Sequence, residues 1–296
     1  MNMRMILQAA MSTPWAIEAN KLVAIIQFLS LRASGVELSE SEIQSRTAHQ
    51  RDPAVTDSSI KVITIAGVIA PRIHMTEGLS SGGGASAERL GLDINAAVKD
   101  KSVDKILLDI DSPGGSVHGI SELGDIIKQA NQTKPVIAVA NHLAASAAYW
   151  IGVNAGEFIV TPGGDVGSIG VISAHQDMSQ SLAALGVDTT IISAGKFKAE
   201  GNPFGPLDEE AKAHLQSRVD EYYDKFVAVV AKGRGVSETQ VRSGFGQGRT
   251  VGSDEALTLG MVDSVETLSQ VIARHQRPQN NRFKSNKRRM QIQNAR

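Results

Sequence analysis

The middle of the chain alternates between short apolar runs and longer segments of mixed polarity. The runs at Lys61–Ile69, Lys105–Ile110 and Val136–Ala140 have the length of buried strands. Segments with helical spacing of apolar residues, Glu88–Lys99 and Val117–Asn131, stand between them. Alternating strands and helices predict an α/β fold with a mostly parallel sheet and crossover helices.

The same pattern predicts three further elements towards the C-terminus. They are a helix at Met178–Leu185, a strand at Thr189–Ser193 and a long helix at Asp208–Lys232. Asp208, followed by two glutamates, is typical of a helix start. The aromatic and aliphatic residues of the long helix recur at helical spacing, so we expect them to face the core or a subunit interface.

These elements divide the chain into three predicted parts. Residues 1–59 form a helical N-terminal extension and linker, residues 60–273 the main domain, and residues 274–296 a basic, disordered tail. The most apolar stretch of the extension, Leu22–Leu31, is only ten residues long, whereas a bilayer span needs roughly 20. We therefore expect a packed amphipathic helix there, no integral membrane anchor and a cytoplasmic protein.

The amino-acid composition excludes several kinds of catalytic and metal site. The 296 residues include no cysteine, which excludes disulfides, a thiol nucleophile and cysteine-based zinc sites. No cofactor or metal is predicted. The net charge is −1, but eight lysines and arginines and no acidic residue lie from Arg274 to the end. This tail is interpreted as solvated, as binding an acidic scaffold or nucleic acid, or as a self-cleavage site. Its single aromatic residue is weak evidence for nucleic-acid recognition, so no nucleic-acid partner is predicted.

Three features are candidates for catalysis. Ser146 follows an apolar run and stands among alanines, where a buried strand turns into a helix. Upstream, the turn Pro113-Gly114-Gly115 can bring a backbone N–H close to a reacting carbonyl. Downstream lies Lys198; a lysine normally has a pKa of about 10.4 and must be desolvated to act as a base. Together they supply the parts of a serine–lysine peptidase.

The order and spacing of these motifs resemble the signal peptide peptidase A family of serine–lysine peptidases. The resemblance runs from about Ile60 to Val265 and includes Asp111-Ser112-Pro113-Gly114-Gly115-Ser116, Ala144-Ala145-Ser146-Ala147-Ala148-Tyr149, Gly167-Ser168-Ile169-Gly170 and Ser193-Ala194-Gly195-Lys196-Phe197-Lys198. Alanines stand where the family usually has glycines after the serine. The segment Pro14-Trp15-Ala16-Ile17 is similar to the N-terminal region of head-maturation proteases of tailed bacteriophages.

The resemblance implies a Clp/crotonase-like fold and a role for each matched residue. Ser146 would be the nucleophile and Lys198 the general base. The N–H groups of Gly115 and Ala147 would form the oxyanion hole, and Ser168 would orient the lysine amine.

The resemblance also implies an assembly and a kind of substrate. Relatives form homo-oligomeric rings, in which serine and lysine can come from adjoining subunits. Scaffold, portal or capsid proteins would be the substrates if the protein is phage-encoded, and it would then act in the host cytoplasm or the procapsid interior. A bacterial cytoplasmic protease that degrades peptides is the alternative.

Other assignments stay open at this point. Lys196 lies two residues before Lys198 and would point to the same side of an extended segment, so periodicity does not choose between them. His175, 29 residues after Ser146, and His142 are rival bases in a Ser–His–Asp arrangement. From other functional classes, a crotonase-like acyl-CoA enzyme and a non-catalytic assembly protein remain as alternatives.

Overall fold

The computed structural model describes residues 13–33, 59–72 and 84–276. Most of the predicted N-terminal extension and of the basic tail lies outside these residues. The described part of the extension contains a short strand, β1 (Trp15–Ile17), and a helix, α2 (Ala19–Ala33). This helix buries Leu22 and Leu29, so the apolar run packs onto the fold as expected. No helix of the described residues has the length and apolar character needed to cross a bilayer.

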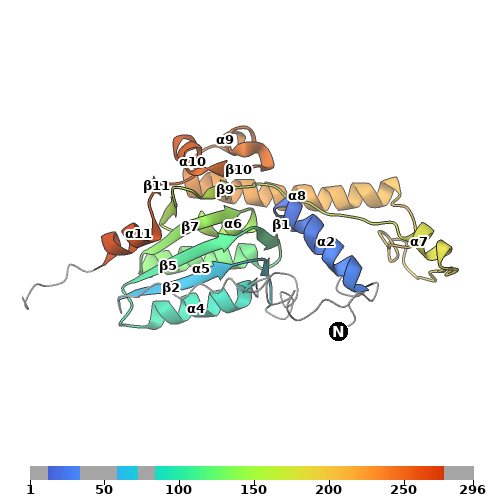
Figure 1. Ribbon diagram of the computed structural model, residues 1–296, viewed down its shortest axis with the longest axis horizontal. Coiled ribbons are helices and arrows are strands. Elements are labelled where there is room, and N and C mark those ends of the chain that lie inside the picture. Colours follow the sequence, from blue (N-terminus) through green and yellow to red (C-terminus); the bar gives the residue numbers. More distant parts are fainter. Residues whose placement is uncertain (1–12, 34–58, 73–83, 277–296) are drawn as a thin grey trace, which may run out of the picture.

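The main sheet has seven strands within the described part of the chain (Figure 1). Parallel pairs join β2 (Ile60–Ala66) to β5 (Lys105–Ser112), and β5 to β7 (Val136–Ala145). The ten-residue β7 pairs twice, first with β8 (Glu157–Val160) and further along with β9 (Asp165–Gly167). The sequence prediction of an α/β fold with a mostly parallel sheet is confirmed.

Two short strands complete this sheet. β10 (Thr250–Gly252) pairs with β9 antiparallel, and β11 (Ser264–Val265) pairs with β8 parallel. The helices α9 (Glu238–Gly244) and α10 (Ser253–Leu259) lie next to these strands in the chain, with a 3-10 turn, η2 (Gly246–Gly248), before β10. Ala256 and Met261 in this closing segment are fully buried in the core.

Alternate side chains of the strands point to opposite faces of the sheet, and helices cover both faces. On one face, Ile106 and Leu108 of β5 pack in the main core with α4 (Ala87–Lys99) and α5 (Ile120–Thr133). On the other face, Leu107 packs with α11 (Leu268–His275). The apolar run of β5 is therefore continuous because it is buried on both sides.

The helix that follows β7, α6 (Ala147–Gly152), is buried along its whole length. Its Trp150 stacks on Phe226 of α8 (Glu209–Arg234), with ring centroids 4.7 Å apart and planes at 11°. The carboxylate of Asp208 accepts a hydrogen bond from the N–H of Ala211 and caps α8, as the sequence predicts. The stacking of Phe226 on Trp150 thereby packs α8 against α6.

A second, smaller sheet lies beside the carboxyl end of β5. Its strand order is β1-β6-β3-β4, where β6 (Gly114–Ser116) belongs to the glycine turn. β3 (Ile69–Ala70) pairs parallel with β6 and with β4 (Ala85–Ser86). β1 pairs antiparallel with the other edge of β6.

Residues 173–208, which we call the arm, lead away from this core (Figure 1). No residue of the arm is buried. It carries one short helix, α7 (Ser179–Ala184), at the far end of α8 from the sheet. The predicted strand at Thr189–Ser193 is wrong: these residues are irregular and exposed, since no neighbouring strand is present on the arm to pair with their backbone.

Candidate active site

Ser146 occupies the sharp turn between β7 and α6. Its backbone has φ 56° and ψ −117°, a left-handed conformation that is uncommon outside glycine. Its N–H donates to the carbonyl of Gly167 (2.7 Å), and its own carbonyl accepts from Trp150 as the first turn of α6 begins. The Ser146 hydroxyl lies 3.4 Å from the carbonyl oxygen of Gly170. A serine held on a strained strand-to-helix turn is the arrangement in which hydrolases present a nucleophile.

The glycine turn lies next to this serine and is held by Ser112. The Ser112 hydroxyl donates to the carbonyl of Gly67 (2.6 Å) and accepts from the N–H of Gly114 (3.2 Å). Ser112 is fully buried and stands opposite Ala144 of β7. Sequence reasoning gave Ser112 no role, although its place directly before Pro-Gly-Gly was a signal for a turn-forming hydroxyl.

The glycine turn lies against the start of α6. Gly114 has φ 96°, and a methyl group placed on it would collide with the Ala16 carbonyl oxygen and lie 3.0 Å from the Ala147 nitrogen. Ala147 is the first residue of α6, so its N–H has no partner within the helix. Gly115, the next residue of the turn, is buried beside it. The turn strand β6, which contains Gly114 and Gly115, is in contact with α6, the helix that begins directly after Ser146.

Ser168 lies on the same side of the site. It directly follows Gly167, whose carbonyl accepts from the Ser146 N–H. It is buried, has φ 52°, and its N–H donates to the carbonyl of Arg249 (2.8 Å). The structure thus places Ser168 and Ala147 beside Ser146, and the strand that holds Gly115 lies against α6.

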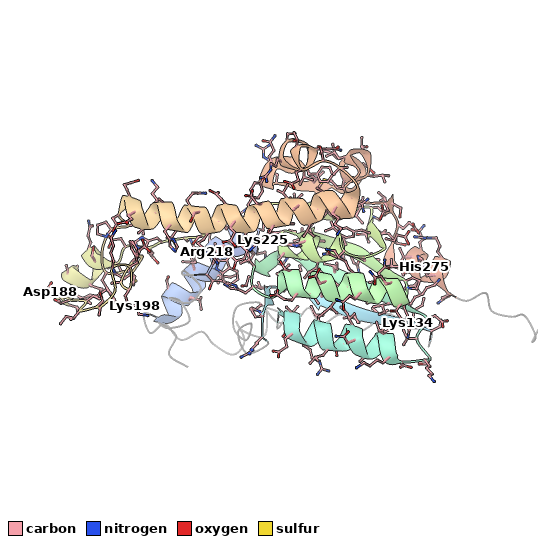
Figure 2. The ribbon with its side chains drawn as sticks, turned by 180° about the vertical axis from the view of Figure 1, so that it is seen from behind. Lys134, Asp188, Lys198, Arg218, Lys225 and His275 are labelled. Carbon is pink, nitrogen blue, oxygen red and sulfur yellow. The ribbon has the colours of Figure 1, made fainter. Side chains whose placement is uncertain are left out.

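Lys198 is not brought to Ser146 within one chain. It lies on the exposed arm, whereas Ser146 begins the buried helix α6 (Figure 2). Figure 2 shows Lys198 near Asp188, at the end of the molecule away from the sheet. No hydrogen bond or ion pair of the Lys198 side chain occurs among the described residues.

The rival bases have partners of their own. The Lys196 ammonium forms an ion pair with Glu210 (2.7 Å) and lies 4.5 Å from the centroid of the Phe197 ring. The His175 ring lies 3.0 Å from the carbonyl of Asn202, on the arm. The His142 ring contacts the carbonyl of Asn141 (2.7 Å) on an exposed part of β7. Neither ring shows a hydrogen bond to Ser146 in the described residues.

The environment of α6 is apolar. The hydroxyl of Tyr149 donates to the carbonyl of Met261 (2.9 Å), and burial raises the pKa of this tyrosine above its ordinary value. Tyr149 thus acts as a neutral tie between α6 and the closing segment. Among the described residues, no cluster of three or more histidine, aspartate or glutamate side chains is arranged to hold a metal ion.

A protein-family model matches the part of the chain that contains several of these residues. The family model "Peptidase family S49" matches residues 128–281, slightly more than half of the chain, and this range includes Ser146, Ser168 and Lys198. A solved structure, the "1510-N membrane protease specific for a stomatin homolog from Pyrococcus horikoshii", aligns over 73% of this chain and 77% of its own, with 16% identity and a TM-score of 0.44.

Several curated proteins are similar in sequence. "Capsid assembly protease C" of Escherichia phage lambda is 32% identical over 70% of this chain and 46% of its own length. "Head-tail preconnector protein GP5" of Enterobacteria phage P21 is 32% identical over 67% of this chain and 40% of its own. The chain thus spans about half or less of these phage relatives. "Putative protease slr0021" of a Synechocystis strain is 31% identical over 66% of this chain and 69% of its own length. The chain therefore belongs to peptidase family S49.

Proposed function

We propose that the protein is a serine endopeptidase in which Ser146 is the nucleophile and Lys198 the general base. The observation that carries this proposal is the position of Ser146. It stands on a strained turn directly before Ala147, whose nitrogen would lie 3.0 Å from a methyl group placed on Gly114 of the glycine turn. Membership of a peptidase family supports the same reaction.

In the proposed mechanism, the Ser146 hydroxyl attacks the carbonyl carbon of the scissile peptide bond. Neutral Lys198 accepts the hydroxyl proton and passes it to the leaving amine. The N–H groups of Gly115 and Ala147 stabilise the oxyanion that forms; loss of one such donor typically lowers turnover by a factor of about 100 to 1000. A water molecule, deprotonated by the same lysine, then hydrolyses the acyl-enzyme.

In the proposed assembly the base comes from another copy of the chain, because Lys198 lies on the exposed arm, away from Ser146 of its own chain. Large apolar side chains of the arm are exposed, including Leu185 at 76% and Ile192 at 95%. Several large apolar side chains exposed on one segment are compatible with an association surface. We therefore propose a homo-oligomer in which the arm of one copy reaches the Ser146 site of the next, with Ser168 orienting the amine of Lys198.

The proposed substrates are proteins of phage head assembly. The printed names of two relatives, a capsid assembly protease and a head-tail preconnector protein, support this class. Other relatives bear the names "Protease 4" and "Putative signal peptide peptidase SppA", so casein serves as a general substrate in the same assay.

The test compares wild type with Ser146→Ala, each incubated with casein or with a phage scaffold protein. Gels and intact masses report cleavage. We expect cleavage by wild type and none by Ser146→Ala. Ser253→Ala is the matched control, because Ser253 is similarly buried but lies on α10 and bonds to the carbonyl of Pro162. Equal cleavage by wild type and Ser146→Ala would rule out the proposed nucleophile.

A further inference from the structure

The segment that contains β1 lies in a groove between two backbone edges next to Ser146. On one side, Trp15 exchanges two hydrogen bonds with Ile172: its N–H donates to the Ile172 carbonyl (2.8 Å) and its carbonyl accepts in return (2.9 Å). On the other side, β1 pairs with β6, the glycine turn. Both pairings are antiparallel. Residues 13–18 are thus bound as an added strand, a common way for a protein to hold an extended peptide.

The register of this strand puts one carbonyl at the proposed oxyanion hole. The N–H of Val117 donates to the Pro14 carbonyl (3.4 Å), and the N–H of Glu18 donates to the Pro113 carbonyl (2.9 Å). Ala16, midway between Pro14 and Glu18, faces Gly115. Bonded and non-bonded pairs alternate in an antiparallel ladder, so Ala16 and Gly115 form a bonded pair. This pairing directs the N–H of Gly115 at the carbonyl of Ala16.

The surroundings of that carbonyl agree with this placement. A methyl group placed on Gly114 would collide with the carbonyl oxygen of Ala16 and would lie 2.9 Å from that of Ala145 and 3.0 Å from the nitrogen of Ala147. The last two residues flank Ser146. The Ala16 carbonyl therefore occupies the place where a substrate carbonyl would meet both oxyanion donors.

Ser146 is inaccessible while this strand is present. Its exposed fraction is 0%, yet a nucleophile must touch the carbonyl carbon that it attacks. The side chain of Ala16 is also fully buried and points into the main core. A peptide that binds in the same register would need a similarly small side chain at this position.

We propose that residues 13–18 are an internal pseudosubstrate that fills the peptide-binding groove and must leave before a protein substrate can enter. The inference rests on the proposed role of Ser146. It makes the single chain a closed form, opened by displacement of β1.

The packing of β1 allows such a displacement without unfolding the main core. The side chains of Trp15 and Ile17 belong to a small separate cluster with α2, whose other members are Leu22, Ile25, Leu29 and Val68. Of β1, only Ala16 contributes to the main core. A short strand in a satellite cluster opens at a lower free energy than the strands of a central sheet.

A reversible crosslink tests whether β1 must move. The chain has no cysteine, so the double variant Trp15→Cys/Ile172→Cys can form only one intramolecular disulfide. Residues that exchange both backbone bonds have Cα atoms about 5.5 Å apart, within the range of a disulfide. We expect the oxidised variant to cleave casein at least about tenfold more slowly than the same protein after reduction, because the closed state is locked.

The single variant Trp15→Cys, treated in the same way, controls for loss of the indole. It should cleave at the same rate before and after reduction. Equal rates for the oxidised and reduced double variant would overturn the inference, since substrate would then enter with β1 in place. The activity of the reduced double variant also shows that this variant folds with an intact site.

Hydrogen exchange tests whether β1 opens locally, and it does so even if no cleavage is found and the proposed function fails. In the full-length wild type, we expect the amides of residues 13–18 to exchange at least about tenfold faster than those of β7, through local opening. Exchange of both segments at one common rate would mean that β1 leaves only when the whole domain unfolds. That result would make β1 a permanent strand of the fold and overturn the inference.

Discussion

At the scale of single residues, Ser146 is held in a conformation that costs free energy. Its angles, φ 56° and ψ −117°, are those of the first central residue of a type II′ turn, a position that glycine normally takes. A side chain in such a region costs of order 1–3 kcal/mol. Packing of the surrounding core offsets this free-energy cost, because the end of β7 and the whole of α6 are buried on the two sides of the turn.

This strain predicts that Ser146→Gly is more stable than Ser146→Ala by about 1 kcal/mol. Glycine relieves the steric cost at positive φ, and this outweighs the larger conformational entropy of glycine in the unfolded chain. Urea unfolding of the two variants measures the difference. At Ser253, the first residue of α10, the order should reverse, because alanine favours a helix and glycine does not. A less stable glycine variant at 146 would contradict the strain argument.

Part of the candidate site could be predicted from the sequence and part could not. A serine after a buried run, a Pro-Gly-Gly turn and the Gly167-Ser168 pair are local signals, and the fold brings them together as expected. Lys198 is different, because its distance from Ser146 depends on where the arm points. The proposed role of Ala16 could not be predicted either, since a three-residue strand carries no periodicity that reveals its partner.

At the scale of elements, apolar periodicity predicted the longer buried segments, whereas short buried strands such as β8 and β9 were not predicted. β5, β7, α4 and α8 begin and end within a few residues of their predicted bounds, apart from the C-terminal extension of β7 to Ala145. The error at Thr189–Ser193 has a physical cause. β-branched residues favour a strand only where a neighbouring strand and a packed face are present, and the arm offers neither.

A contact between elements makes the stability of the fold depend on pH. Arg234 at the end of α8 donates to the carboxylate of Asp263 (2.6 Å) and to the carbonyl of Gly260 (2.8 Å). Partial burial raises the pKa of Asp263, but hydrogen bonds from Arg234 and from the Phe158 amide outweigh it, so the pKa lies below its ordinary value of 3.8. Because the folded state favours the ionised carboxylate, this stabilisation is present above pH 3.8 and is lost as the pH falls further.

We therefore expect Asp263→Asn to lower the free energy of unfolding at neutral pH by about 1 kcal/mol, a value reduced by the partial exposure of the pair. The gap to wild type should narrow as the pH is lowered below 3.8. Urea titrations over this pH range provide the measurement. Asp188→Asn, on the exposed arm, is the control and should stay within about 0.5 kcal/mol of wild type. A constant gap at every pH would show that the charge of Asp263 does not contribute.

At the scale of the whole molecule, the two halves of the proposed dyad lie in different parts of the shape. The core holds Ser146, and the arm carries Lys198 away from it along α8 (Figures 1 and 2). Two conditions then control the proposed activity: another copy must deliver its arm, and β1 must leave the groove. Assembly and displacement of β1 would both be required before a protein substrate is cleaved.

Subunit mixing tests the first of these conditions. Ser146→Ala and Lys198→Ala should each be inactive alone, because each assembly lacks one partner of the dyad. Co-expressed in equal amounts, they should regain about a quarter of the wild-type rate, since a site is complete only where an intact core meets an intact arm. Lys196→Ala, which removes the lysine paired with Glu210, is the matched control and should be active on its own. If mixed assemblies form but stay inactive, Ser146 and Lys198 do not act across subunits, and the arm would have to fold back onto its own core.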